Sequence, residues 1–196
     1  MQKQLAMQLK QVLSRIAEFT LKSITSPHHF WENVVERKAT IKVFPQFYLP
    51  LLIVTVLAGI AGEFLSNPEA LLSFSLVYAV KQIIVFLIHF FISVYVINKL
   101  LAYAGGKENT ESAQMAVGFS MGPIFLVSII TGLFPFLYPV NILGLYGLYL
   151  FYCGVPRLFE IPETRIKMFI VAAVLANFFI FASLSIIFWK LLDFIY

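Results

Sequence analysis

The sequence predicts an all-α polytopic membrane protein, a bundle of five transmembrane helices preceded by an amphipathic amino-terminal helical segment. Composition is the first reason: 60% of the 196 residues are hydrophobic and 12% are charged, whereas about 25% of the residues in ordinary soluble domains are charged. The mean hydropathy of +0.88 is the second. Length is the third, because a span needs about 20 apolar residues and 196 residues therefore accommodate about five spans with their connections.

Residues 1–43 are predicted to form a cytoplasmic amphipathic segment, and residues 44–196 the transmembrane domain. Apolar residues recur in the first part of the segment at spacings of four and three, on one face of a helix: Leu5, Leu9, Val12, Ile16 and Phe19. Basic residues flank this stripe, as they do in helices that lie on an anionic membrane surface. A short coiled coil is the alternative.

A second amino-terminal helix is predicted to start at Ser26 and Pro27, with Ser as the N-cap and Pro in the first turn. Its apolar residues are expected to face lipid headgroups: Phe30, Trp31, Val34 and Val35.

Five apolar stretches have the length of a membrane span. They run from about 44 or 47 to 65, from a start between 71 and 81 to about 101, from about 115 to 134, from about 136 or 140 to 153, and from about 168 to 189. Residues 134–140, FPFLYPV, predict a tight turn between the third and fourth spans. Asn109 or Thr110 is expected to cap the third span.

Small residues spaced three or four apart in these spans predict close helix packing, because they let two backbones approach each other. The candidate packing positions are Ala58, Gly62, Gly118, Gly122, Gly144 and Gly147.

The basic residues gather in alternate connections. Of the 14 Lys and Arg residues, seven lie in the amino-terminal segment, two around the second connection and three in the fourth. Because cytoplasmic loops are enriched in Lys and Arg, five spans place the amino terminus in the cytoplasm and the carboxyl terminus outside.

Polar residues inside the spans form the candidate site: Glu63, Tyr78, Lys81, Gln82, His89, Ser93 and Asn177. If the first two spans are antiparallel neighbours, Glu63 and Lys81 are able to meet and relieve each other's desolvation. The polar residues of the second span fall on one helical face around His89. This stripe is interpreted either as a proton or ion path or headgroup pocket, or as a satisfied structural network with a snorkelling lysine.

The sequence carries no motif for a metal site, a cofactor or a familiar hydrolase. Adjacent histidines on a helix, such as His28 and His29, point about 100° apart. We therefore expect a protein that is not an enzyme, has no metal and no cofactor, and does not bind nucleic acid.

Five short motifs carry a family resemblance over about residues 25–190. They are the segment SPHHFWENV before a proline-bearing first span, Gly105-Gly106-Lys107, Gly118-Phe119-Ser120 with Pro123, Leu145-Tyr146-Gly147, and a charged loop after Gly154. With them, the chain resembles the YIP (Ypt-interacting protein) family, particularly its short bacterial members. The resemblance implies five spans, a cytoplasmic amino terminus and a place in the bacterial inner membrane.

Eukaryotic members of that family are linked to vesicle traffic and bind prenylated Rab-type GTPases and one another. This chain lacks their Asp-Leu-Tyr-Gly-Pro motif, of which Gly122-Pro123 is the nearest remnant. The expected function is that of a non-enzymatic membrane scaffold or adaptor whose partners are membrane lipids, other membrane proteins or a second copy of the chain. A small transporter or channel that uses the stripe around His89 is the alternative.

Overall fold

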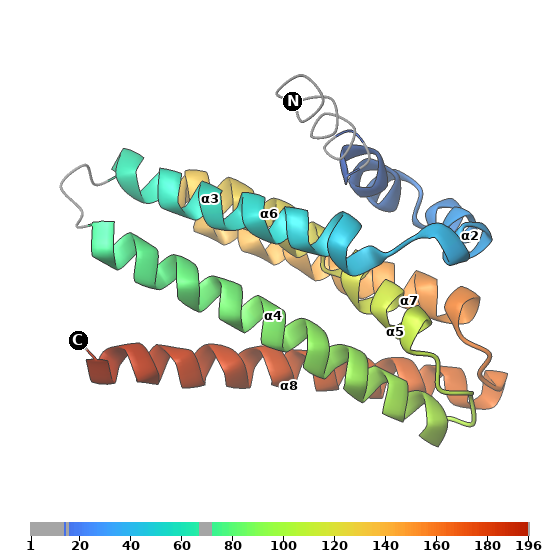
Figure 1. The fold of residues 1–196 in the computed structure, drawn as a ribbon. Coiled ribbons are helices and arrows are strands. Elements are labelled where there is room, and N and C mark those ends of the chain that lie inside the picture. Colours follow the sequence, from blue (N-terminus) through green and yellow to red (C-terminus); the bar gives the residue numbers. More distant parts are fainter. Residues whose placement is uncertain (1–13, 15, 67–71, 196) are drawn as a thin grey trace.

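Helices account for the regular structure of residues 14, 16–66 and 72–195, which are the residues that the computed structural model describes. Figure 1 shows an elongated bundle in which most helices run along one direction. In chain order the elements are α2 (Pro27–Glu36), η1 (Lys38–Thr40), η2 (Phe44–Tyr48), α3 (Leu49–Ser66), α4 (Leu72–Tyr103), α5 (Thr110–Ser120), α6 (Gly122–Leu133), η3 (Pro135–Leu145), α7 (Tyr146–Leu158) and α8 (Glu163–Ile195).

Five stretches of the described chain are helical, long and apolar enough to cross a membrane. They are Phe44–Ser66, Ala79–Tyr103, Thr110–Leu133, Pro135–Leu158 and Glu163–Phe188. Each one contains the core of a span predicted from hydropathy, so the predicted fold class, an all-α polytopic bundle, is confirmed. Two helices begin earlier than predicted: the third span begins at Thr110 rather than near Met115, and the fifth at Glu163 rather than near Met168.

The expectation that α2 presents its apolar face to lipid headgroups is wrong. Phe30, Trp31 and Val34 are buried inside the protein, and among the four apolar residues only Val35 is exposed. Helix α2 packs against α7, and the Phe30 and Trp31 rings contact Phe119 of α5. Burial of these side chains against the spans removes more apolar area from water than a headgroup layer does.

The helix that precedes α2 covers residues 16–25. Ile16 is buried in the core, and the ring of Phe19 contacts those of Phe47 and Phe119. This part of the predicted stripe therefore covers protein, whereas Leu5, Leu9 and Val12 lie outside the described residues. Ser26 stands at the N-cap position of α2 and Pro27 follows it, but the Ser26 side chain makes no capping hydrogen bond.

The third span is divided into α5 and α6. Pro123 lacks the N–H group that would continue the hydrogen-bond ladder, so the helix is interrupted just before it, and α6 starts again at Gly122. At the other end, Asn109 caps α5, because its Oδ1 accepts a hydrogen bond from the Ser112 N–H at 2.9 Å. The prediction of a cap at Asn109 or Thr110 is thus confirmed for Asn109.

The tight turn predicted for residues 134–140 is wrong. The chain turns at Phe134 and then forms η3, a 3₁₀ helix of 11 residues that leads directly into α7. Pro135 occupies the first position of η3, where its missing N–H group costs no helical hydrogen bond. Here the two prolines mark a stretch of 3₁₀ helix between two α-helices, and not a tight turn.

The core is centred on the aromatic side chains of η2, α4 and α5. The most buried large residues include Trp31, Phe47, Tyr48, Phe90, Phe119 and Phe125. Helix α3 packs on α6, α4 on both α5 and α8, and α5 on α7. Helix α8 lies at the edge of the bundle next to α4 (Figure 1), and 11% of its most apolar stretch is buried, against 56% for the α5–α6 span.

Small residues stand where backbones meet. A methyl group added at Gly62 of α3 would overlap the Gly132 carbonyl of α6, and one at Gly147 would overlap the Ser120 carbonyl. Ala58 is buried beside this crossing. The remaining candidate positions face side chains: Gly118 meets Val43, Gly122 meets Phe47, and Gly144 meets Ile124.

One end of the bundle gathers the amino-terminal elements and two connections between spans. Lys38 of η1 donates a hydrogen bond to the Ser112 hydroxyl of α5 at 2.6 Å, and Arg165 of α8 donates to the Tyr103 carbonyl of α4 at 3.5 Å. Arg157 of α7 pairs with Glu32 of α2. These are the segments whose basic residues were predicted to share one side of the membrane.

Candidate functional site

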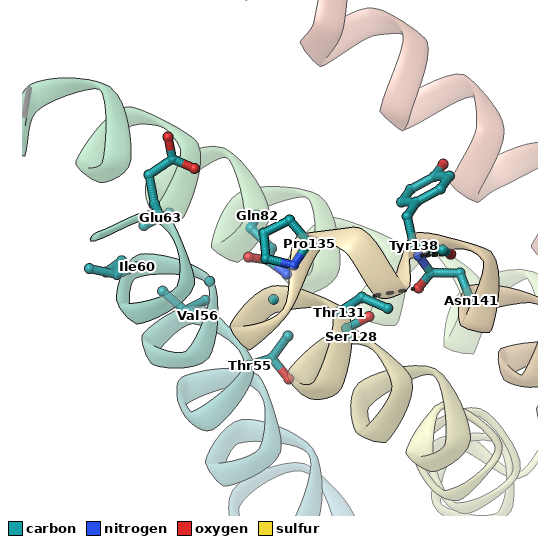
Figure 2. Close-up of a pocket in the computed structure, with 13 residues that line it drawn as sticks. Thr55, Val56, Ile60, Glu63, Gln82, Ser128, Thr131, Pro135, Tyr138 and Asn141 are labelled. Carbon is teal, nitrogen blue, oxygen red and sulfur yellow. Dashed lines mark hydrogen bonds between the residues drawn. The ribbon is translucent and has the colours of Figure 1, made fainter. Parts of the chain in front are cut away.

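A cavity lined by both apolar and polar residues lies between α3, α4, α6 and η3, and its volume is about 540 Å³. Figure 2 shows its lining residues, which come from these four elements. The polar ones are Thr55, Glu63, Gln82, Ser128, Thr131, Tyr138 and Asn141. The cavity brings together two residues of the predicted site, Glu63 and Gln82.

Hydrogen bonds hold one wall of this cavity in place. The Thr131 hydroxyl of α6 donates to the Val127 carbonyl at 3.0 Å and lies 3.4 Å from the Asn141 Oδ1 of η3. The Asn141 amide nitrogen donates to the Tyr138 carbonyl at 3.0 Å. The amide of Asn141 is therefore fixed between α6 and η3 (Figure 2).

Glu63 and Lys81 do not form an ion pair in the described part of the chain. The ion pairs there join Glu18 to Lys22, His29 to Glu32, Lys99 to Glu108 and Arg157 to Glu32. Glu63 is exposed near the end of α3 and lines the cavity with Gln82. Lys81 precedes Gln82 on α4 and is partly buried, but it is not among the lining residues.

His89 lies deeper in the bundle and does not line the cavity. His89 is 2% exposed, its Nε2 is 3.3 Å from the Ser93 hydroxyl, and its ring lies nearly perpendicular to that of Phe181 of α8, with 5.5 Å between the ring centroids. Its Nδ1 has no hydrogen-bond partner among the described residues, although the backbone of Asn177 lies close to the ring. His89 and Ser93 thus form a pair that faces α8.

Of the other two predicted site residues, Asn177 is not among the residues that line the cavity. Asn177 of α8 bonds within its own helix, since its amide donates to the Ala173 carbonyl at 2.8 Å. The side chain of Tyr78 lies outside the described ones. The polar residues of α4 therefore face different helices along its length. Gln82 faces α3 and α6, whereas His89 faces α8.

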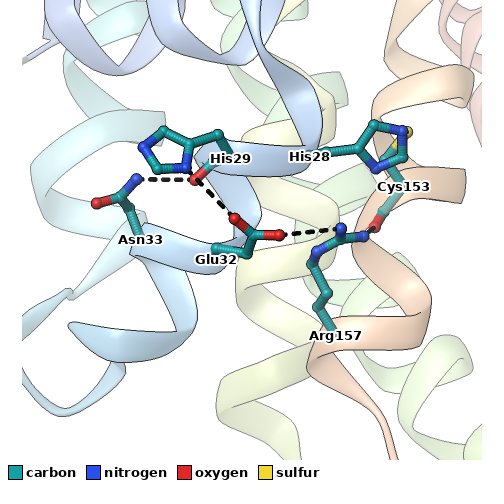
Figure 3. Close-up of polar contacts among 6 residues, drawn as sticks. All are labelled: His28, His29, Glu32, Asn33, Cys153 and Arg157. Atoms are coloured by element: carbon teal, nitrogen blue, oxygen red, sulfur yellow. Dashed lines mark hydrogen bonds and ion pairs between the residues drawn. The ribbon is translucent and has the colours of Figure 1, made fainter.

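A second polar cluster joins α2 to α7, as Figure 3 shows. The two carboxylate oxygens of Glu32 lie 3.3 Å from His29 Nδ1 and 3.3 Å from Arg157 Nη2. Arg157 also donates to the Cys153 carbonyl at 3.1 Å, and the Cys153 sulfur is 3.9 Å from His28 Nε2. Within the described residues, no three His, Cys, Asp or Glu side chains are grouped so as to hold a metal ion.

The surroundings of Glu32 favour its ionised form. The hydrogen bond from His29 and then that from Arg157 lower the pKa of the Glu32 carboxyl group below its ordinary value. The carboxylate therefore stays charged at neutral pH and helps to hold α2 on α7.

Sequence reasoning missed much of the cavity lining. Ser128, Thr131 and Asn141 were not singled out, because hydroxyl and amide groups are less conspicuous in an apolar span than a charge. One signal was present: Ser128 and Thr131 are three residues apart and therefore share a helical face. No sequence signal placed that face opposite Gln82.

Five helical stretches that are long and apolar enough to cross a membrane define a multi-pass α-helical membrane protein. The family model described as Yip1 domain matches residues 21–185. The chain belongs to the Yip1 domain family, which confirms the resemblance found in its sequence motifs. The matched region starts before α2, so it includes the amino-terminal helix that packs on α7. Searches of curated proteins and of solved structures found no match.

Proposed function

We propose that this protein is a non-enzymatic membrane scaffold or adaptor, and that it acts through lateral contacts of α8 with other membrane-embedded helices. The observation that carries the proposal is the exposure of α8, since 11% of its most apolar stretch is buried inside the protein. This helix packs on α4 and, more briefly, on α7. Its outer face presents large exposed apolar side chains: Val171, Leu175, Phe178, Phe179, Ile186 and Ile187.

A span with this surface has two kinds of neighbour, lipid tails and the helices of other proteins. Lipid tails are as apolar as leucine, so helix association in membranes depends on close packing and not on hydrophobicity alone. Adjacent Phe178 and Phe179 give α8 an uneven surface that a complementary helix is able to pack against. The protein's polar side chains, by contrast, fasten its own elements together, as in the pairs Glu32–Arg157 and Lys38–Ser112.

Photo-crosslinking tests this proposal. A photoreactive amino acid is placed at Phe178 of α8 or, as a control, at Leu57 of α3, which is 58% exposed. In native membranes we expect the Phe178 position to yield a discrete protein adduct, identified by mass and reproduced with the purified partner, and the Leu57 position to yield lipid adducts. Lipid adducts alone from both positions would contradict the adaptor role.

The proposed location is the bacterial inner membrane, with the amino terminus in the cytoplasm and the carboxyl terminus outside. The concentration of basic residues in alternate connections supports this orientation. Single cysteines test it in a background without Cys153: a membrane-impermeant reagent should label Ser66→Cys in intact cells and Lys107→Cys only after lysis. The reverse pattern would invert the topology.

The alternative function is transport of a small solute or ion through the polar stripe of α4. It is favoured by His89, a buried histidine within the span Ala79–Tyr103, because intramembrane histidines act in proton relays. Proteoliposomes under a pH gradient distinguish the two functions. The adaptor role predicts no flux and no change on His89→Ala, whereas flux that disappears in His89→Ala would favour transport.

A further inference from the structure

The cavity between α3, α4, α6 and η3 has the size of a small-ligand site. Its volume of about 540 Å³ falls in the range of about 300–1,000 Å³ that is common for ligand pockets. The lining includes apolar side chains, among them Val56, Ile60 and Pro135, as well as the polar ones. Such a mixture suits a ligand with a polar group on a short hydrocarbon stem.

Charge limits what the cavity attracts. Among the described residues that line it, Glu63 is the one that carries a formal charge at neutral pH, and it is negative. Divalent metal ions such as Ca²⁺ take six to eight oxygen ligands and usually several carboxylates. A single carboxylate beside neutral hydrogen-bonding groups suits a monovalent organic cation better.

The neutral groups suit an ammonium ion in particular. An ammonium group has three N–H donors and no acceptor, so it needs several oxygen atoms around it. Glu63, the amide of Gln82 and the hydroxyl of Ser128 are oxygen-bearing groups that line the cavity from three different helices, with Glu63 toward one end and Ser128 beside Thr131 in Figure 2. Thr131, on the same face of α6 as Ser128, lies 3.4 Å from the Asn141 Oδ1 of η3, and this contact holds the wall in place, which lowers the entropy cost of binding.

The position of Glu63 near the end of its span makes its carboxylate group accessible from the membrane surface. It is three residues from the end of the span Phe44–Ser66, and its side chain is exposed. Charged groups at this depth reach the headgroup layer, so a ligand is able to enter from water or from the lipid.

We propose that this cavity is a binding site for a primary ammonium group on a short stem, as in ethanolamine. Its source is either the headgroup of phosphatidylethanolamine or a free water-soluble amine. The site does not rest on the adaptor role of α8, because it involves neither that helix nor its outer face.

The test uses the purified full-length protein in detergent, with three lipids and one free amine as probes. Native mass spectrometry measures retention of phosphatidylethanolamine, phosphatidylcholine and phosphatidylglycerol, and thermal unfolding measures the effect of ethanolamine. Glu63→Gln removes the charge with little change of shape, and Gln82→Leu removes a neutral oxygen. Glu160→Gln, an exposed carboxylate in the α7–α8 connection, is the matched control.

Phosphatidylethanolamine should be retained about tenfold more tightly than phosphatidylcholine, whose quaternary ammonium has no N–H group to donate a charge-assisted hydrogen bond to Glu63. This preference should disappear in Glu63→Gln, weaken in Gln82→Leu and persist in Glu160→Gln. If ethanolamine raises the unfolding temperature of wild type but not of Glu63→Gln while lipid retention shows no preference, the ligand is a free amine. Equal retention of the three lipids with no ethanolamine effect, or identical behaviour of wild type and Glu63→Gln, overturns the proposal.

Discussion

The indole Nε1 of Trp31 donates a hydrogen bond to the main-chain carbonyl of Leu150, 2.8 Å away, and thereby ties α2 to α7 across 119 residues of sequence. Trp31 is completely buried. A methyl group at Gly154, one turn further along α7, would lie 2.6 Å from the indole Cε2. The absence of a side chain at Gly154 therefore lets the indole approach the α7 backbone.

Replacing Trp31 by Phe should destabilise the protein by about 1–3 kcal/mol, because the change removes a buried hydrogen bond and leaves a gap beside Gly154. Thermal unfolding in detergent measures this loss. Tyr152→Phe, an exposed aromatic position on α7, is the control and should change the midpoint little. A midpoint for Trp31→Phe equal to that of wild type would show that α2 is not anchored through the indole.

Gly62→Ala should destabilise the crossing of α3 and α6 by about 1–3 kcal/mol, the usual range for overpacking. Its methyl group would overlap the Gly132 carbonyl, and backbone atoms yield less easily than a flexible side chain. Ala61→Val adds more volume at the neighbouring exposed position of the same helix and should be nearly neutral. If the two variants unfold at the same temperature, the contact between Gly62 and Gly132 contributes little to stability.

Asn109→Ala should cost about 0.5–2 kcal/mol, because it removes the N-cap acceptor of α5 and leaves the Ser112 N–H without its partner. Asn109→Asp keeps an acceptor oxygen in the same place and should retain most of the stability. Hydrogen exchange at the first turn of α5, compared between the two variants, measures the effect locally. Equal protection in Asn109→Ala and Asn109→Asp would argue against a capping role.

The contact of Glu32 with His29 and Arg157 should make stability depend on acid pH. Since the folded protein lowers the pKa of Glu32 below its ordinary value of 4.5, this contribution is fully present above that value and is lost as the pH falls through the lowered pKa. Glu32→Gln should therefore flatten the acid side of the curve of unfolding temperature against pH.

The matched control for that curve is Glu36→Gln, which removes an exposed carboxylate of the same helix that takes part in none of the described ion pairs. Its curve should follow that of wild type. Because Glu32 is exposed to solvent, the difference should also shrink in high salt. Parallel acid limbs for wild type and Glu32→Gln would contradict the stabilising role of the contact.

Features that depend on residues close together in the chain were predictable from the sequence. Hydropathy identified each span, the Asn109 cap follows from residue type and position, and Pro123 marks the break between α5 and α6. The error at residues 134–140 has a related origin. Proline signals that an α-helix is interrupted, but it does not say whether the chain then turns or continues as a 3₁₀ helix.

The candidate site was predictable only in part. Glu63 and Gln82 stood out as polar residues in apolar runs, and both line the cavity. Ser128, Thr131 and Asn141 joined them through the packing of α6 and η3, which no local pattern encodes. His89 was predicted on the same face of α4 as Gln82, yet two turns along the helix its neighbour is Phe181 of α8.

The sequence by itself determined the class of protein, the helical spans and the segments that carry the basic charge, because each depends on residues close together in the chain. Only the tertiary structure decided what covers each apolar face. Trp31 and Phe30 have the pattern of a helix on a membrane, but α5 and α7 cover them. The physical reason is that lipid tails are as apolar as a protein core, so the pattern of an apolar face is the same whichever of the two it meets.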